Sequence, residues 1–218
     1  MDFETARINM VEQQIRPWNV LETQTLRVLT EIRREDFVPE PYQDLAFADV
    51  QVPMNDKEFM LEPKVGARMV EALGLSSDHR VLEIGTGTGY LTAILASLCH
   101  HVTSIEIDES LHARARVNLA RAGIDNVKLV LGDCFRYCGE AENQDRLFDR
   151  ILISGSLPQV DERFTRRLVP DHGRIVGIEG HDPAMQVVIV RPDSTRRSLF
   201  ETHVPRLRNV IDERAFTF

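Results

Sequence analysis

The chain has 218 residues, 43% of them hydrophobic and 28% charged, which is typical of a globular protein with one sizeable core. The net charge of −8 disfavours a nucleic-acid partner, which requires clustered lysine and arginine. No apolar run approaches the roughly 20 residues of a membrane span, and residues 1–10 lack the pattern of a signal peptide, so we expect a cytoplasmic protein without a membrane partner.

Residues 1–75 are predicted to form a helical N-terminal extension that includes the substrate-access region. Apolar residues recur at helical spacing on both sides of Pro17. The passage 47–62, "FADVQVPMNDKEFMLE", shows little periodicity and predicts a loop. Pro63 then suits the first turn of a further helix.

Residues 76–218 are predicted to form an α/β core, and the extension and the core make one domain over residues 1–218. Near-continuous apolar strands alternate with helical segments, which indicates a parallel sheet covered on both faces. Two last strands, "MQVVIVR" and "SLFETHV", are expected to finish the sheet as an antiparallel pair. The fold class is therefore α/β, doubly wound, with a mostly parallel sheet. The parallel strands are "RVLEI", "HVTSIEI", "NVKLVLGD", "FDRILIS" and "GRIVGIEG", and a helix is expected around residues 161–168 before the last of them.

A glycine-rich stretch, "VLEIGTGTGYL", places Gly85, Gly87 and Gly89 directly after the first predicted strand. Open α/β sheets bind ligands beyond the carboxyl ends of their strands, so the loop is well placed for a ligand. The spacing is neither the dinucleotide fingerprint, because Tyr90 stands where that motif has glycine, nor a phosphate-binding P-loop. The glycines alone are equally consistent with a tight strand-to-helix turn.

Two acidic residues extend the pattern to the next strands. Glu106 ends the second strand, where a carboxylate can accept hydrogen bonds from both hydroxyls of a ribose. Asp133 ends the third strand, where a loop can contact an adenine. Together with the glycines, these strand ends predict a nucleoside-type cofactor.

These motifs resemble a known family. "VLEIGTGTGYLTAILA", the acid in "VTSIEID" and "NVKLVLGD" are similar to the Rossmann-like, S-adenosylmethionine-dependent methyltransferases. "DFVPE", "LAFADVQVPM", "FDRILISGSLP" and "HVPRL" narrow the resemblance to protein-L-isoaspartate O-methyltransferases over nearly the whole chain. The resemblance implies a monomeric protein-repair enzyme that methylates the carboxylate of isoaspartyl residues in damaged proteins, using S-adenosylmethionine and releasing S-adenosylhomocysteine.

The resemblance also implies a set of cofactor contacts around the glycine loop and the acidic strand ends. The expected contacts are Glu83, Gly85, Thr86, Gly87, Gly89, Tyr90, Leu91, Glu106, Ile107, Gly132, Asp133 and Cys134. No metal site is expected, because Cys99, Cys134 and Cys138 lack the spacing of zinc ligands.

One segment departs from the family pattern. Where the family usually carries Thr-Ile-Ser-Gln-Pro, this chain reads "FMLEP", so the position of the reacting-side hydroxyl is Leu61. Ser154 or Ser156 in "ISGSLP" is a candidate to supply a hydroxyl instead. Asp49 and Glu62 are further candidates to line the substrate side, although a carboxylate at 62 would repel a carboxylate substrate.

The chemistry leaves three functions open. A carboxylate acceptor is ionised at pH 7 and needs no general base, and no histidine stands in a motif loop, which favours an acidic acceptor. An isoaspartyl carboxyl methyltransferase fits this best. A methyltransferase of the same fold acting on another protein or small molecule, such as a small carboxylate, and a non-catalytic S-adenosylmethionine-binding protein remain as alternatives.

Overall fold

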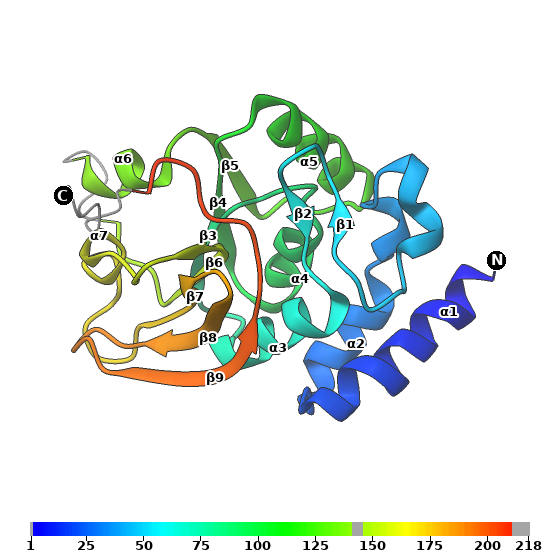
Figure 1. Ribbon diagram of the computed structural model, residues 1–218, viewed down its shortest axis with the longest axis horizontal. Coiled ribbons are helices and arrows are strands. Elements are labelled where there is room, and N and C mark those ends of the chain that lie inside the picture. Colours follow the sequence, from blue (N-terminus) through cyan, green and yellow to red (C-terminus); the bar gives the residue numbers. More distant parts are fainter. Residues whose placement is uncertain (1, 141–145, 211–218) are drawn as a thin grey trace.

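The computed structural model describes residues 2–140 and 146–210 and is organised around one large sheet (Figure 1). The sheet has seven strands in the order β5-β4-β3-β6-β7-β8-β9. Strands β3 to β7 run parallel, and β8 and β9 are antiparallel, as the sequence predicted. The strands are β3 (Arg80–Ile84), β4 (His101–Glu106), β5 (Val127–Leu131), β6 (Arg150–Leu157), β7 (Arg174–His181), β8 (Ala184–Val190) and β9 (Arg196–Thr202).

Both faces of the central strands β3, β4, β6 and β7 are largely buried, which confirms the doubly wound fold. Successive side chains of a strand point to opposite faces, so Val81 packs into one hydrophobic cluster and Leu82 into the other. The first cluster includes side chains of α3, α4 and α5, and the second includes those of α6 and α7. These helices are α3 (Pro63–Leu73), α4 (Tyr90–Leu98), α5 (Glu109–Arg121), α6 (Cys134–Gly139) and α7 (Glu162–Thr165).

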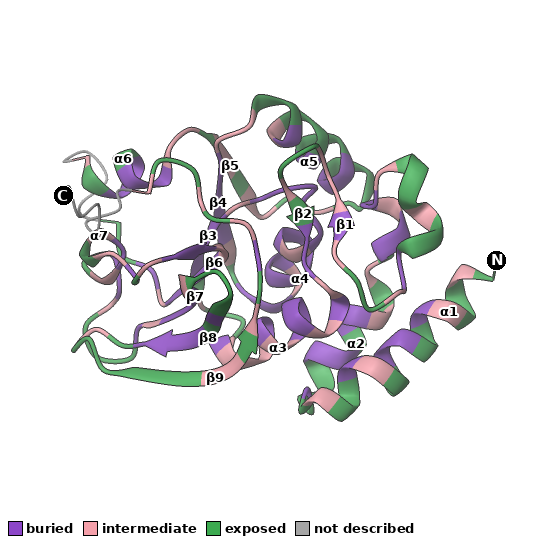
Figure 2. Cartoon of the chain, viewed as in Figure 1, coloured by how far each residue is buried: buried purple, intermediate pink, exposed green. Residues whose placement is uncertain are grey.

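The N-terminal segments pack against the first cluster (Figures 1 and 2). They comprise α1 (Phe3–Asn9), which a π-helical stretch continues, and α2 (Thr23–Glu31). The segment expected to be a loop contains a short antiparallel hairpin of β1 (Val52–Pro53) and β2 (Phe59–Met60). As predicted, α3 begins at Pro63. In the described part of the chain, no helix is long and apolar enough to cross a membrane.

Three local features differ from the sequence-based expectation. Helix α6 was not predicted, and it forms because the Asp133 side chain accepts hydrogen bonds from the first free N–H groups of the helix. Helix α7 covers only Glu162–Thr165 of the expected 161–168. Strand β6 continues past Ser154 to Leu157, since the backbone of Ser156 pairs with β7 and with the segment after β9.

Candidate functional site

Two adjoining cavities lie at the carboxyl ends of the parallel strands. The first cavity has an empty volume of about 710 Å³, including its part open to solvent, and is lined by residues at the ends of β3, β4, β5 and β6. The second cavity has an empty volume of about 440 Å³, again including its open part, and is lined by the glycine loop, the start of α4 and the segment Phe59–Pro63. The two cavities share Met54, Phe59, Gly85, Gly87 and Ser154, so they form one continuous site.

The glycine loop must lack side chains because two others occupy the space beside it. Gly85 and Gly87 have φ values of +91° and +56°, which side chains rarely adopt. A Cβ at Gly87 would lie 2.8 Å from Met54 Sδ, and one at Gly85 would lie 2.5 Å from Ser154 Oγ. The loop therefore exposes backbone to the cavities while Met54 and Ser154 approach it closely.

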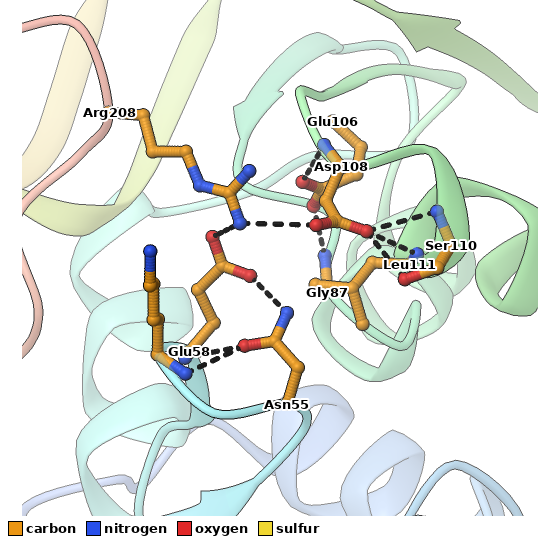
Figure 3. Close-up of polar contacts among 9 residues, drawn as sticks. Asn55, Glu58, Gly87, Glu106, Asp108, Ser110, Leu111 and Arg208 are labelled. Atoms are coloured by element: carbon orange, nitrogen blue, oxygen red, sulfur yellow. Dashed lines mark hydrogen bonds and ion pairs between the residues drawn. The ribbon is translucent and has the colours of Figure 1, made fainter.

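Glu106 is the buried acceptor of the first cavity (Figure 3). Its two carboxylate oxygens accept hydrogen bonds from the backbone N–H groups of Gly87 at 2.8 Å and Asp108 at 2.9 Å. Burial raises the pKa of Glu106, and these N–H groups oppose the rise. Each oxygen retains acceptor capacity for a ligand hydroxyl.

The segment Val204–Asn209, called the strap below, closes the first cavity from the side of β6. In Figure 1 this part of the chain (red) runs back across the sheet from β9 toward α6. The Arg208 guanidinium lies 2.5 Å from Glu58 in the β1–β2 hairpin and 3.1 Å from Asp108 after β4 (Figure 3). One side chain thus connects three segments that are distant in sequence.

Asp133 has two roles at the far wall of this cavity. Its Oδ1 accepts hydrogen bonds from the N–H groups of Phe135 and Arg136, which caps α6. Its Oδ2 accepts a hydrogen bond from the strap residue Asn209 at 2.7 Å. The strap therefore contacts the predicted adenine-side acid Asp133 directly, and through Arg208 it contacts Asp108, which follows the predicted ribose-side acid Glu106 in the same strand-end loop.

The second cavity is supported from beneath by a buried cation. Arg34 donates through Nη2 to the carbonyl of Leu61 and through Nε to that of Ala46, both at 2.9 Å. Its guanidinium lies 4.7 Å from the ring centre of Tyr90, which also lines this cavity. Arg34 consequently fixes the backbone of the segment that departs from the family pattern.

Glu83 lies beneath the glycine loop, and its side chain is fully buried. Oε2 accepts hydrogen bonds from the hydroxyls of Thr92 at 2.5 Å and Ser104 at 2.6 Å, whereas Oε1 has no partner among the described residues. Burial raises the pKa of Glu83 to about 7. Ser104 also bonds to Thr86, so this network anchors the loop from below.

Most of the residues expected at the site do line the two cavities. Four do not. Asp49 pairs with Lys64, and the Ser156 hydroxyl donates to the carbonyl of Val204 inside the fold. Glu83 supports the loop, and Gly89 faces α5. The lining residues from the expected set are Leu61, Glu62, Gly85, Thr86, Gly87, Tyr90, Leu91, Glu106, Ile107, Gly132, Asp133, Cys134 and Ser154.

Several lining residues are not among the site residues expected from the sequence. Met54, Glu58 and Arg34 come from the N-terminal extension, and Leu207 and Arg208 come from the strap. The motif "HVPRL" marks the strap as a family landmark, but nothing in its pattern indicates which strand end it crosses.

The first cavity fits the nucleoside part of S-adenosylmethionine. It combines a buried carboxylate acceptor at Glu106 with apolar walls from Ile105, Ile107 and Leu111. The second cavity continues it along the glycine loop, where a ligand can approach the backbone of Gly85 and Gly87. The residues present therefore suit a cofactor with a nucleoside at one end and a second polar group beyond it.

Comparisons with known proteins agree with this arrangement. The profile of the family described as protein-L-isoaspartate(D-aspartate) O-methyltransferase (PCMT) matches residues 6–199. A Nitrobacter winogradskyi protein-L-isoaspartate O-methyltransferase is 36% identical over 181 residues, covering 83% of this chain and 81% of the relative. An Anaeromyxobacter protein-L-isoaspartate O-methyltransferase 2 is 35% identical over 207 residues, covering 95% of this chain and 83% of the relative.

A solved structure with a similar fold comes from a protein assigned to the same family. A Plasmodium falciparum structure, assigned as a protein-L-isoaspartate O-methyltransferase and solved in complex with S-adenosyl-L-homocysteine, superposes with a TM-score of 0.81. The match covers 93% of this chain and 98% of that one at 18% identity, so it bears on the fold alone. By its sequence match over most of its length, this chain belongs to the protein-L-isoaspartate(D-aspartate) O-methyltransferase family.

Proposed function

We propose that this chain transfers the methyl group of S-adenosylmethionine to the free carboxylate of L-isoaspartyl residues in damaged proteins. The observation that carries the proposal is the continuous pair of cavities along the glycine loop, with Glu106 in the first and the segment Phe59–Pro63 in the second. Membership of the family supplies the reaction class. The product is a methyl ester together with S-adenosylhomocysteine.

The cofactor supplies an activated methyl group, which an acceptor carboxylate attacks as the carbon–sulfur bond breaks and sulfur takes its electron pair. We propose that Glu106 accepts the ribose hydroxyls and that Gly85 and Gly87 admit the cofactor to their backbone. Ser154 holds the end of β3 by donating to the carbonyls of Ile84 and Gly85. Met54, Phe59 and Leu207 exclude water from the reacting ends, which favours a direct displacement.

A second candidate function is methyl transfer to a different acceptor. It is favoured by the side chains of Leu61 and Glu62 in the second cavity, because Leu61 offers no hydroxyl and Glu62 brings a negative charge. A small carboxylate bound without contact to these two side chains, or an acceptor carrying a positive charge, would suit such a cavity better.

A radiolabel methyl-ester assay separates these functions. Purified protein, labelled S-adenosylmethionine and an isoaspartyl peptide should give base-labile methyl ester, and the same peptide with normal aspartate should not. Labelling of another molecule in a cell extract, without labelling of the isoaspartyl peptide, favours the second candidate. Cofactor binding without transfer to any acceptor leaves a non-catalytic binding protein.

We further propose that the protein acts as a cytoplasmic monomer of one domain, in which the extension 1–75 serves the core 76–218. Support comes from packing of the N-terminal helices into the same hydrophobic cluster as α3 and α4. The net charge of −8 also argues against nucleic acid as a partner. Light scattering after gel filtration gives the mass, and about 25 kDa is expected from the 24.9 kDa chain.

A further inference from the structure

The side chain of Glu62 lines the second cavity with one carboxylate oxygen that lacks a hydrogen-bond partner in the described part of the chain. Its Oε2 is buried and has no hydrogen-bond partner among the residues that the structure describes. Its Oε1 accepts only one hydrogen bond, at 3.3 Å, from Gln51, whose amide also donates to the carbonyl of His203 at 2.5 Å. The carboxylate lines the cavity together with Leu61 and the glycine loop.

The cationic side chains of Arg34 and Lys64 are bonded to groups other than Glu62. Arg34 donates to the carbonyls of Ala46 and Leu61, and burial lowers its pKa while the charge of Glu62 opposes the decrease. Lys64 pairs with Asp49 and lies 4.6 Å from the ring centre of Trp18. Glu62 is therefore attracted by Arg34 but bonded to neither cation.

A buried carboxylate oxygen without a hydrogen-bond partner is unfavourable unless a ligand or an opposite charge compensates it. The ligand expected in these cavities carries a positive sulfonium and a positive ammonium, whereas its product S-adenosylhomocysteine carries only the ammonium. We infer that Glu62 binds the sulfonium charge of S-adenosylmethionine and so makes the site prefer the cofactor over its demethylated product. This inference rests on the proposed function for the identity of the cofactor.

The same charge has a consequence for the reaction. Methyl transfer to a carboxylate neutralises the sulfonium, so the attraction to Glu62 is present in the ground state and weaker in the transition state. Glu62 also repels an anionic acceptor. The residue therefore favours release of the product and tight binding of fresh cofactor at the expense of the chemical step.

The test compares binding of three ligands to the wild type and to Glu62→Gln by isothermal titration without an acceptor. The ligands are S-adenosylmethionine, S-adenosylhomocysteine and sinefungin, in which a protonated amine replaces the methyl sulfonium. We expect Glu62→Gln to lower the affinity for S-adenosylmethionine and for sinefungin by about five- to tenfold relative to the affinity for S-adenosylhomocysteine. In steady state the KM for S-adenosylmethionine should rise while kcat does not fall.

Asp49→Asn is the matched control, because it removes a carboxylate from the same region that is paired with Lys64 and outside both cavities. It should leave the ratio of the affinities unchanged. Equal weakening of all three ligands by Glu62→Gln would overturn the inference, since the ammonium is common to them. An unchanged ratio would overturn it as well, while failure of all three ligands to bind the wild type would instead refute the proposed function.

Discussion

Leu61 is the residue at which we expect the largest effect on activity toward isoaspartate. The resemblance to the family implies a hydroxyl at this position, and the backbone of Leu61 is held in place by Arg34 rather than being free to adjust. Ser154 also lines the second cavity, but its hydroxyl hydrogen is directed at the backbone carbonyls of Ile84 and Gly85. An acceptor carboxylate thus lacks an evident hydroxyl donor at this position.

We predict weak methylation of isoaspartyl peptides by the wild type and higher activity for Leu61→Ser, alone or with Phe59→Thr. A recovered hydrogen bond to an anion is worth about 1–3 kcal/mol, or roughly one to two powers of ten in kcat/KM. The radiolabel methyl-ester assay measures kcat/KM for the isoaspartyl peptide in the wild type and in each variant. Leu61→Ala is the control, since it removes the apolar side chain without adding a donor. Full wild-type activity that disappears in Ser154→Ala would show that Ser154 takes this role.

Glu83 predicts a dependence of stability on pH. Its pKa is raised from 4.5 to about 7 by burial, so the native state holds the proton more tightly than the unfolded state does. The stability that this proton confers is complete below pH 4.5 and is lost as pH rises to about 7. At about 1.4 kcal/mol per unit, the loss over this window is about 3 kcal/mol.

Glu83→Gln should flatten this part of the profile, because an amide retains an acceptor for Thr92 and Ser104 but does not titrate. Urea unfolding at several pH values between 4.5 and 8 gives the free energies to compare. Glu162→Gln, at an exposed ion pair of α7, serves as the control. Parallel profiles for the wild type and Glu83→Gln would show that Glu83 does not carry the dependence.

At the scale of elements, the site is closed by two segments that do not belong to the parallel sheet. The β1–β2 hairpin brings Met54 and Glu58, and the strap brings Leu207 and Arg208. Leu207 packs on Gly155, where an added Cβ would lie 2.6 Å from its side chain. The hairpin and the strap meet through the Arg208–Glu58 ion pair (Figure 3), and we expect ligand exchange to be faster when this contact is broken.

We predict that Arg208→Gln increases the dissociation rate of S-adenosylhomocysteine by about three- to fivefold, the effect of losing a partly exposed ion-pair network. A chase of bound, labelled product with an excess of unlabelled product measures the rate. High salt should accelerate release from the wild type and should have less effect on the variant, because the ion pair is screened. Arg166→Gln, directly after α7, is the control, and equal release rates in all three proteins would contradict the role of the strap.

At the scale of the whole molecule, cofactor binding should stabilise the fold. A ligand at 100 times its dissociation constant adds about 2.7 kcal/mol to the unfolding free energy. For a domain of this size that corresponds to a rise in Tm of about 5–10 °C. Gly87→Val should abolish the rise, because its side chain would collide with Met54. Gly123→Val is the control, since Gly123 also has a positive φ, +70°, but faces open space.

The sheet and half of the site follow from local sequence. Apolar strands separated by helices determine a parallel sheet, and its order places Gly85, Glu106 and Asp133 at one edge. The remaining half depends on contacts between segments that are far apart in the chain. No periodicity indicates that Arg208 reaches Glu58, or that Arg34 reaches Leu61, because such pairs are set by tertiary packing. For Asp133 the sequence predicts a ligand contact but does not predict that its side chain caps α6.

The position of the strap has a consequence during synthesis on the ribosome. All seven strands of the sheet precede the strap in the chain, so Leu207 and Arg208 leave the ribosome after the other residues that line the first cavity. A nascent chain whose strap has not yet emerged has the glycine loop and Glu106 but lacks one wall of the first cavity. Tight cofactor binding, with the stabilisation it brings, is therefore acquired only after the strap has emerged and packed against the sheet.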